Sequence, residues 1–366
     1  MLRNLLFSIL AVAVALLLGA GVLWVSGYDV PEALGALVTG AVGSVNANAE
    51  TLLATTPLLM AALAVAIGLR GGLFNIGVEG QFLMGGLFAA WVGFACAALP
   101  APLLVALILL SGVAGGALWA AIAGALKARF GAHEVITTIM LNYVAMKLVS
   151  WLVRGPLHGP GPIPQTTYIP EGAHLPLLIQ DTRLHAGLIL ALAAAAGVWW
   201  FLWKTPWGFA VRTVGLNPDA AEYAGIGMRR TMVGTMALSG GLAGLAGGTQ
   251  IAGVDFRLVQ EGFSAGYGYD SIAVSLLGLN HPFGIVLAAW LFAALRSGAG
   301  QMQVEAGVSS QIISVLQALV ILMVAAEAGI RYYIDQGRQK KRTAAGPALE
   351  QTVPPAEASP REEAKT

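Results

Sequence analysis

Apolar residues in this chain gather in long blocks that are separated by short polar or glycine-rich stretches. Leu5–Val25 and Leu103–Leu126 are two such blocks. Blocks of roughly 18 to 24 residues have the length that a helix needs to cross about 30 Å of hydrocarbon. Transmembrane β-strands would instead alternate apolar and polar residues over about 10 positions, which these blocks do not. The pattern therefore predicts an all-α fold.

The number of blocks predicts a polytopic membrane helix bundle with about ten transmembrane helices, some of them broken or short. Arg3 before the first block also fits a signal peptide. That block is longer than a usual signal core and lacks a clear cleavage site, so we interpret it as a membrane helix. The predicted ranges are 5–26, 50–69, 77–98, 103–126, 134–153, 186–203, 231–252, 270–280, 282–297 and 309–328.

Small residues recur every four positions on two of the predicted helices. Membrane helices associate through close packing rather than through escape from water, so such stripes let two backbones approach each other. We therefore expect tightly packed helices at these positions. The stripes are Gly112, Gly116, Ala120 and Gly124 on one helix, and Gly240, Gly244 and Gly248 on another.

Lysine and arginine residues are unevenly shared between the predicted connections, and such residues favour the cytoplasmic side of a membrane. This predicts a multi-pass protein of a bacterial-type plasma membrane, with both termini in the cytoplasm. The cytoplasmic coupling loop is then 204–230 and the long external loop is 154–185. The cations expected inside are Arg70, Lys127, Arg129, Lys204, Arg212, Arg229, Arg230, Arg331, Arg338, Lys340, Lys341 and Arg342, and those expected in external loops are Arg154, Arg183, Arg257 and Arg296.

Residues 1–342 are expected to form the transmembrane domain. The tail 343–366 is rich in Ala, Pro, Glu and Lys and has almost nothing apolar to bury. Such a composition cannot offset the entropy of ordering the chain, which predicts a disordered cytoplasmic tail.

Composition excludes several classes of protein. Hydrophobic residues make up 57% of the chain and charged residues 11%, whereas a soluble domain has about 25% charged residues. The net charge of +1 gives no reason to expect a nucleic-acid partner. A single cysteine, Cys96, excludes a disulfide framework, and His133 with Glu134 lacks the second histidine of a zinc motif, so we expect no metal site.

No arrangement typical of catalysis can be identified in the sequence. Glycine-rich runs such as "GGLAGLAGG" lack the Lys-Ser/Thr pair of a phosphate-binding loop. We therefore expect neither an enzyme nor a cofactor in this chain.

The stretch "GLFNIGVEGQFLMGG" places Asn75, Glu79 and Gln81 at the start of a predicted membrane helix. An ionisable side chain at that depth must face protein or water, because facing lipid costs about 2.5 to 3.5 kcal/mol. Two interpretations stay open. The three residues could form an internal polar clamp for a broken helix, or a polar element beside a permeation path.

Two further polar clusters are candidates for a substrate pathway. In "HEVITTIMLNYVAMK", Thr138 and Asn142 lie at helical spacing, and a buried amide there must find partners. In "GYGYDSIAVSLLGLNHPFG", Tyr269 and Asp270 open a segment too short to cross the bilayer before Pro282. Short, interrupted segments are typical of broken helices around a pathway, although the tyrosines would also suit an interfacial anchor.

The segment "AVRTVGLNPDAAEYAGI" predicts a short helix in the cytoplasmic loop. Asn217 can cap it, Pro218 suits its first turn, and Ala220, Ala221 and Ala224 form a strip of small residues. Such a helix is either a docking surface or only a well-capped loop.

Together these segments resemble the membrane subunits of ATP-binding-cassette (ABC) importers of the branched-chain amino acid, ribose and nucleoside permease superfamily. The resemblance covers about Ala47 to Arg331. "GLFNIGVEGQ" and "EVITTIMLNY" are most similar to the larger permease subunit of nucleoside importers. The family's cytoplasmic pattern R-x-x-G-x-N-x-x-A-A-x-x-x-G-I, which lies against the ATPase, is filled here by Arg212, Gly215, Asn217, Ala220, Ala221, Gly225 and Ile226.

This resemblance implies a nucleoside permease within a heteromeric importer surrounded by membrane lipid. The expected partners are a second related permease, an ATPase subunit with two cassettes that binds the ATP, and an external substrate-binding lipoprotein that lands near 154–185. A simple-sugar permease is the alternative within the family. An ion-coupled secondary transporter and an intramembrane enzyme are the alternatives outside it.

Overall fold

The computed structural model describes residues 2–259, 262–309, 311–320, 322–323 and 326, and side chains from residue 13 onward within these ranges. The predicted tail 343–366, the basic cluster 331–342 and the end of the predicted range 309–328 lie outside the described residues. The helices and sites described here belong to one compact unit, Met1–Ala325.

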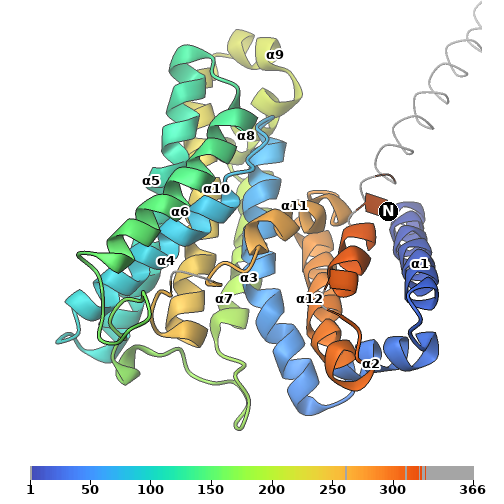
Figure 1. Ribbon diagram of the computed structural model, residues 1–366. Coiled ribbons are helices and arrows are strands. Elements are labelled where there is room, and N and C mark those ends of the chain that lie inside the picture. The colour runs from blue at the N-terminus through green and yellow to red at the C-terminus, as the bar shows by residue number, and fades with distance from the viewer. Residues whose placement is uncertain (1, 260–261, 310, 321, 324–325, 327–366) are drawn as a thin grey trace, which may run out of the picture. The chain divides into compact units, whose positions relative to one another are not determined.

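The described residues form an all-α membrane helix bundle (Figure 1), in which β-pairing is confined to isolated bridges. Six of the helices described, α3 to α7 and α12, are long and apolar enough to cross a membrane. The helices are α1 Leu2–Val25, α2 Val30–Val42, α3 Val45–Arg70, α4 Val78–Ala95, α5 Ala101–Phe130, α6 Glu134–Arg154, α7 Gly187–Lys204, α8 Pro206–Leu216, α9 Pro218–Tyr223, α10 Met228–Gln250, α11 Tyr267–Leu277 and α12 Pro282–Glu305. A further apolar helix spans Gln311–Val320.

Polar capping residues set helix boundaries that the apolar blocks did not predict. Helix α2, absent from the predicted ranges, begins where the Asp29 carboxylate accepts a hydrogen bond of 2.9 Å from the Glu32 amide. Helix α3 begins at Val45 rather than at residue 50, because the Ser44 hydroxyl accepts a bond of 3.0 Å from the Ala47 amide. Such caps satisfy amides that have no partner within the helix, so the helices extend into polar sequence.

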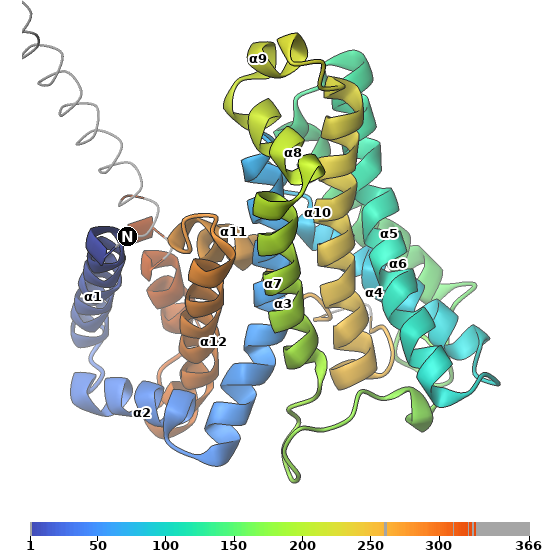
Figure 2. The ribbon, with the colours of Figure 1, turned by 180° about the vertical axis from the view of Figure 1, so that it is seen from behind.

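Helices α3 and α4 lie at the centre of the bundle. In their most apolar windows 83% and 72% of the residues are buried, against 22% for α6 and 28% for α7. A helix that is apolar on all sides and buried on all sides is surrounded by other helices. Figures 1 and 2 show α3 passing between α10 on one side and α12 on the other, and it packs on both.

The two predicted glycine stripes face each other where α5 packs on α10. A Cβ atom added to Gly116 would overlap the carbonyl oxygen of Gly240, and one on Gly244 would overlap that of Gly112. The expected close packing is therefore confirmed for these residues. The two backbones come this close because glycine has a hydrogen atom in place of a side chain at these positions.

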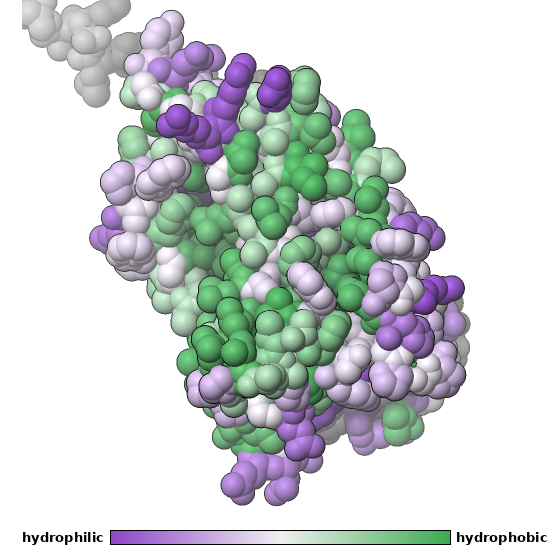
Figure 3. Space-filling model, turned by 90° about the vertical axis from the view of Figure 1, so that its left-hand side faces the viewer, coloured by the Kyte–Doolittle hydropathy of each residue, from purple (hydrophilic) through white to green (hydrophobic). Residues whose placement is uncertain are grey.

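The outer helices expose apolar side chains. On the face shown in Figure 3, hydrophobic residues cover the centre and hydrophilic residues gather toward the edges. On helix α6, for example, the exposed apolar side chains include Ile136, Met140, Val144 and Trp151. In a multi-pass membrane protein such a surface faces lipid or other membrane helices.

The long connection between α6 and α7 is fixed to the chain that follows α10. Helix α10 continues into a π-helical turn, Ile251–Asp255. The amides of Leu175, Ile169 and Thr166 donate to the carbonyl oxygens of Ala252, Phe256 and Leu258, at 2.8 to 2.9 Å. This loop is therefore an ordered part of the structure at the end of the bundle opposite α9.

Candidate functional site

The connection between α3 and α4 is held by a side-chain network centred on Asn75. Its amide nitrogen donates to Gln81 and to Ser239 of α10, both at 2.9 Å, and its oxygen accepts from the Gly77 amide at 2.9 Å. Gln81 completes the pair by donating back to Asn75 at 3.0 Å, and Ser239 donates to the carbonyl of Ala64 in α3. The network therefore ties the interruption between two buried helices to a third helix.

Glu79 lies between the starting turns of two helices. It is in the first turn of its own helix, α4, and its carboxylate accepts a hydrogen bond of 2.8 Å from the amide of Gly268 in the first turn of α11. Helix N-termini present unpaired amides and partial positive charge, which a carboxylate satisfies. A Cβ atom at Gly268 would overlap the Glu79 backbone, so glycine is required for this approach.

Asn142 of α6 caps the start of α4 from outside. Its side-chain oxygen accepts from the Gly80 amide at 2.8 Å, and its nitrogen donates to the Ile76 carbonyl at 2.9 Å. This supplies the cap that Gly77, the residue before α4, cannot provide with a side chain.

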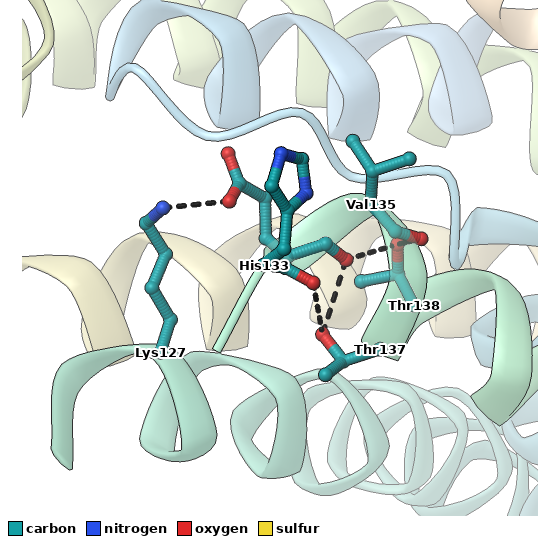
Figure 4. Close-up of polar contacts among 6 residues, drawn as sticks. Lys127, His133, Val135, Thr137 and Thr138 are labelled. Carbon is teal, nitrogen blue, oxygen red and sulfur yellow. Dashed lines mark hydrogen bonds and ion pairs between the residues drawn. The ribbon is translucent and has the colours of Figure 1, made fainter. Parts of the chain in front are cut away.

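Thr138 takes no part in these bonds between helices. Figure 4 shows it at the start of α6, where its hydroxyl donates to the Glu134 carbonyl of its own helix at 2.7 Å. Glu134 in turn forms an ion pair of 2.6 Å with Lys127 at the end of α5. Thr138 packs against Gly77, so it contributes packing to this site rather than a hydrogen bond between helices.

The candidate pathway residues form two adjoining groups. Asn75, Glu79, Gln81, Thr138 and Asn142 are all buried, and each has its hydrogen-bonding groups engaged within the protein. We define these five residues as the polar junction. Their arrangement matches the internal clamp that was one of the two interpretations of the sequence.

Tyr269 and Asp270 line an open cavity of about 450 Å³, and the Tyr269 hydroxyl also interacts with the side chain of Asn142, so this cavity adjoins the polar junction. It is bounded by the start of α11, the second half of α12 and the helix Gln311–Val320. Polar and apolar groups share its wall, and Tyr269 is 46% exposed. The lining residues are Ala265, Gly266, Tyr269, Asp270, Arg296, Ala299, Gly300, Gln303, Ile313, Ser314 and Gln317.

Arg296 crosses one side of this cavity and has three contacts. It forms an ion pair of 3.2 Å with Asp270, donates to the Ala265 carbonyl at 2.7 Å, and lies over the Tyr267 ring with 4.4 Å to the centroid. The expectation of an external-loop position for Arg296 is wrong, because α12 continues through it to Glu305. The sequence did indicate a special role for Arg296, because a cation inside an apolar block is usually a functional or paired group.

The segment predicted as a coupling helix forms α9. The Asn217 side chain accepts a hydrogen bond of 3.0 Å from the Ala220 amide, and Pro218 occupies the first turn, which confirms the predicted cap. After the helix Gly225 has a φ of 75°, in the left-handed region that favours glycine, and the Ile226 amide donates to the Ala221 carbonyl at 3.0 Å.

Several residues of the family pattern face the protein itself. Ala221 is fully buried, whereas Ala220 and Ala224 are exposed. A Cβ atom at Gly215 would overlap the Arg70 carbonyl oxygen at the end of α3, and the Arg212 guanidinium lies over the Trp203 ring at 5.9 Å. These residues hold α8 and α9 against the bundle.

The most exposed apolar side chains here lie between the pattern positions. Leu216 is 86% exposed and Tyr223 is 94% exposed. The sequence pattern did not single them out, although a large apolar residue in a polar loop is itself a signal of a contact surface. We define Leu216, Ala220 and Tyr223 as the α9 surface.

Comparison with known proteins places this chain in a family. The family model described as branched-chain amino acid transport system / permease component matches residues 47–325. The chain is 41% identical over 348 residues to the guanosine ABC transporter permease protein of Bacillus subtilis, an alignment that covers 94% of this chain and 99% of that protein.

Two other relatives differ in the substrate that they are named for. The nucleoside ABC transporter permease protein of Lactococcus lactis subsp. cremoris is 34% identical over 352 residues, covering 94% of this chain and 96% of the relative. The glucose ABC transporter permease protein of Haloferax volcanii is 36% identical over 325 residues, covering 86% of this chain and 85% of the relative. No solved structure matches the chain. The chain therefore belongs to the permease-component family of the branched-chain amino acid transport system, and it is a transport component of the membrane rather than an enzyme.

Proposed function

We propose that this chain is a membrane-spanning permease subunit of an ATP-driven importer that moves nucleosides inward from an external binding protein. The observation that carries the proposal is the 41% identity with a guanosine ABC transporter permease over 94% of this chain. The sequence has no phosphate-binding loop of its own, so ATP would be bound by a separate ATPase subunit with two cassettes.

The proposed topology has about ten crossings and both termini in the cytoplasm. The positions of the basic residues support this topology, because they gather at one end of the bundle. Lys127 and Arg129 in the last turn of α5, Arg70 in the last turn of α3 and Lys204 in the last turn of α7 all lie toward α8 and α9. The opposite end holds the loop between α6 and α7, where an external lipoprotein would land.

The ATPase would dock on the α9 surface. The exposed Tyr223 supplies an aromatic ring of the kind that is enriched at the centre of interfaces, and the exposed Leu216 and the small Ala220 lie beside it. Arg212, Gly215, Asn217, Ala221, Gly225 and Ile226 would then act indirectly by holding α9 in place. A second related permease would cover part of the apolar surface of the outer helices, with lipid on the remainder.

Uptake by reconstituted vesicles tests the proposal. Vesicles containing this chain, the second permease and the ATPase, supplied with the binding protein and radiolabelled guanosine, should accumulate guanosine only when ATP reaches the ATPase. An ATPase with inactivated cassettes is the control and should abolish uptake. Accumulation driven by a proton or sodium gradient without the ATPase would contradict the proposal and favour an ion-coupled secondary transporter.

A simple-sugar permease is the second candidate, favoured by the 36% identity with a glucose ABC transporter permease. The same vesicles distinguish the two. Excess unlabelled uridine or adenosine should compete with guanosine, and excess glucose or ribose should not. Accumulation of labelled glucose without accumulation of any nucleoside would select the sugar permease.

A further inference from the structure

The cavity lined by Tyr269 and Asp270 has the size of a small-molecule site. Its volume of about 450 Å³ lies within the range of about 300 to 1,000 Å³ that ligand sites usually have. Arg296 lies about 21 Å along α12 from the first residue of that helix. This is deep within a helix long enough to cross the membrane.

The ion pair in the cavity wall requires a polar environment. The side chains of Arg296 and Asp270 are 29% and 35% exposed, so the pair is only partly covered by this chain. Partly exposed charges at such a depth face water, protein or a polar ligand rather than lipid, because lipid contact is costly. The cavity is therefore expected to be hydrated or occupied.

Pairing leaves the wall without net charge. Arg296 is engaged by Asp270, by the Ala265 carbonyl and by the Tyr267 ring. Ala265 itself has a φ of 44°, a conformation that residues other than glycine seldom adopt and that often marks ligand sites. A phosphate or carboxylate ligand would have to displace Asp270, whereas a neutral ligand can bind to both members of the intact pair.

The remaining wall suits a flat, polar molecule. Tyr269 presents an exposed aromatic ring, and Ala299 and Ile313 supply apolar contact. Gln303 and Gln317 bring amides that can both donate and accept hydrogen bonds. A nucleobase stacks on aromatic rings through its face and hydrogen-bonds through its edge, and its ribose adds further hydroxyl groups.

We propose that this cavity holds the nucleoside during its passage through the subunit, with the base against Tyr269 and the polar edges at Asp270, Arg296, Gln303 and Gln317. The proposal rests on the function proposed above. It assigns the polar junction no direct contact with substrate.

Site-directed labelling tests occupancy of the cavity. Gly300 lines the cavity, and a Cβ atom added there meets nothing within 4 Å, so Gly300→Cys fits the fold. In a Cys96→Ala background, the complete complex with its ATPase and binding protein is treated with a methanethiosulfonate reagent, with and without guanosine. Guanosine should slow modification at least about fivefold, and guanosine monophosphate should not. Glu32→Cys, on the exposed start of α2, is the control and should react equally in both conditions.

Equal modification of Gly300→Cys with and without guanosine, in a complex that imports guanosine, would overturn the site and leave the importer function standing. Failure of the wild-type complex to import any nucleoside would instead overturn the function itself. The two failures are therefore distinguishable.

Uptake kinetics of Tyr269 variants provide a second test. Loss of one base-stacking contact should lower uptake at limiting guanosine about tenfold in Tyr269→Ala, while Tyr269→Phe keeps the ring and should stay within about twofold of wild type. The ATPase recovered with each variant shows whether the complex assembled. Wild-type uptake by assembled Tyr269→Ala would overturn the stacking contact and with it the proposed site.

Discussion

At the scale of single residues, Glu79 shows why a carboxylate is found where the sequence otherwise suits lipid. Its carboxylate lies in the first turn of α4 and accepts from the Gly268 amide in the first turn of α11. Glu79 and Gly268 are both buried, so the carboxylate supplies the acceptor that this amide would otherwise lack.

Replacing Glu79 by glutamine should therefore be tolerated. Glutamine keeps an oxygen that can accept from Gly268, so Glu79→Gln should assemble and transport at a measurable rate. Glu79→Leu leaves buried amides unpaired at about 1 to 3 kcal/mol each. It should lower the thermal unfolding temperature in detergent and the yield of assembled complex. A fully assembled Glu79→Gln complex without transport would show that the charge itself is needed.

His185 is a second residue whose surroundings predict a measurable effect. It lies just before α7, outside the membrane-spanning segment, where its Nδ1 accepts from the Gly187 amide at 3.0 Å and its ring fills the space left by Gly253. Burial lowers the pKa of His185 from 6.5 to about 4. The folded protein therefore holds this ring neutral.

The sign of the pH dependence follows from that lowered pKa. The unfolded chain binds a proton below about pH 6.5 and the folded chain only below about pH 4, so the contribution of His185 is complete above pH 6.5 and is lost as the pH falls toward 4. The loss is at most about 3 kcal/mol. The unfolding temperature in detergent should fall over this range, and less steeply in His185→Gln, which keeps an acceptor but cannot titrate. Equal slopes for the two proteins would contradict this role.

At the scale of helices, close approach of α5 and α10 depends on the glycines that face each other. Gly116→Ala places a methyl group against the Gly240 carbonyl, and overpacking of this kind costs about 1 to 3 kcal/mol. Gly197→Ala in α7 is the matched control, because its Cβ atom meets nothing within 4 Å. It should be neutral, or slightly stabilising through helix propensity. Thermal unfolding of both variants in detergent measures the difference, and equal unfolding temperatures would contradict the packing argument.

Helix α9 provides a similar comparison between neighbouring positions. Ala220 is exposed and Ala221 is fully buried. Ala220→Glu should leave the bundle folded but reduce the ATPase that copurifies with this chain, because it adds a charge to the docking surface. Ala221→Glu should instead destabilise the permease itself, since it buries a charge. Normal ATPase recovery with Ala220→Glu would exclude the α9 surface as the docking site.

These two alanines also show what sequence can and cannot predict. Apolar blocks located the long helices, and glycine stripes marked the closely packed faces of α5 and α10, because both follow from local composition. That these two faces pack against each other was not predicted. The cap at Asn217 followed from local chemistry. Which of two adjacent alanines faces outward depends on how α9 rests on α8 and α10, and no local difference reveals it.

The candidate site was only partly predictable for the same reason. The polarity of Asn75, Glu79 and Gln81 indicated that they face protein or water, and left an internal clamp and a permeation path both open. The partner of Glu79 is an amide 189 residues away, and a backbone amide leaves no chemical signature in the sequence. The role of Arg296 depends on Asp270 being brought beside it by the turn between α11 and α12.

At the scale of the whole permease unit, a series of contacts connects the α9 end of the bundle to α11, the short helix whose start lines the cavity. Gly215 at the end of α8 rests on the last turn of α3. Arg70 in that turn donates to the carbonyls of Asn280 and Leu279 at 3.1 and 3.3 Å, in the connection between α11 and α12. A displacement of α9 by a bound ATPase thus has a contiguous set of contacts through which to reach α11.

Such a transmission requires that α9 and the α6–α7 loop lie on opposite sides of the membrane. Thr167 is exposed in that loop, so a cysteine placed there is accessible to a labelling reagent. His133→Cys, exposed between α5 and α6, reports on the α9 end. In a Cys96→Ala background, an impermeant thiol reagent applied to intact cells should label Thr167→Cys at once and His133→Cys only after the membrane is permeabilised. The reverse order would invert the proposed topology, and would place the α9 surface where no cytoplasmic ATPase could reach it.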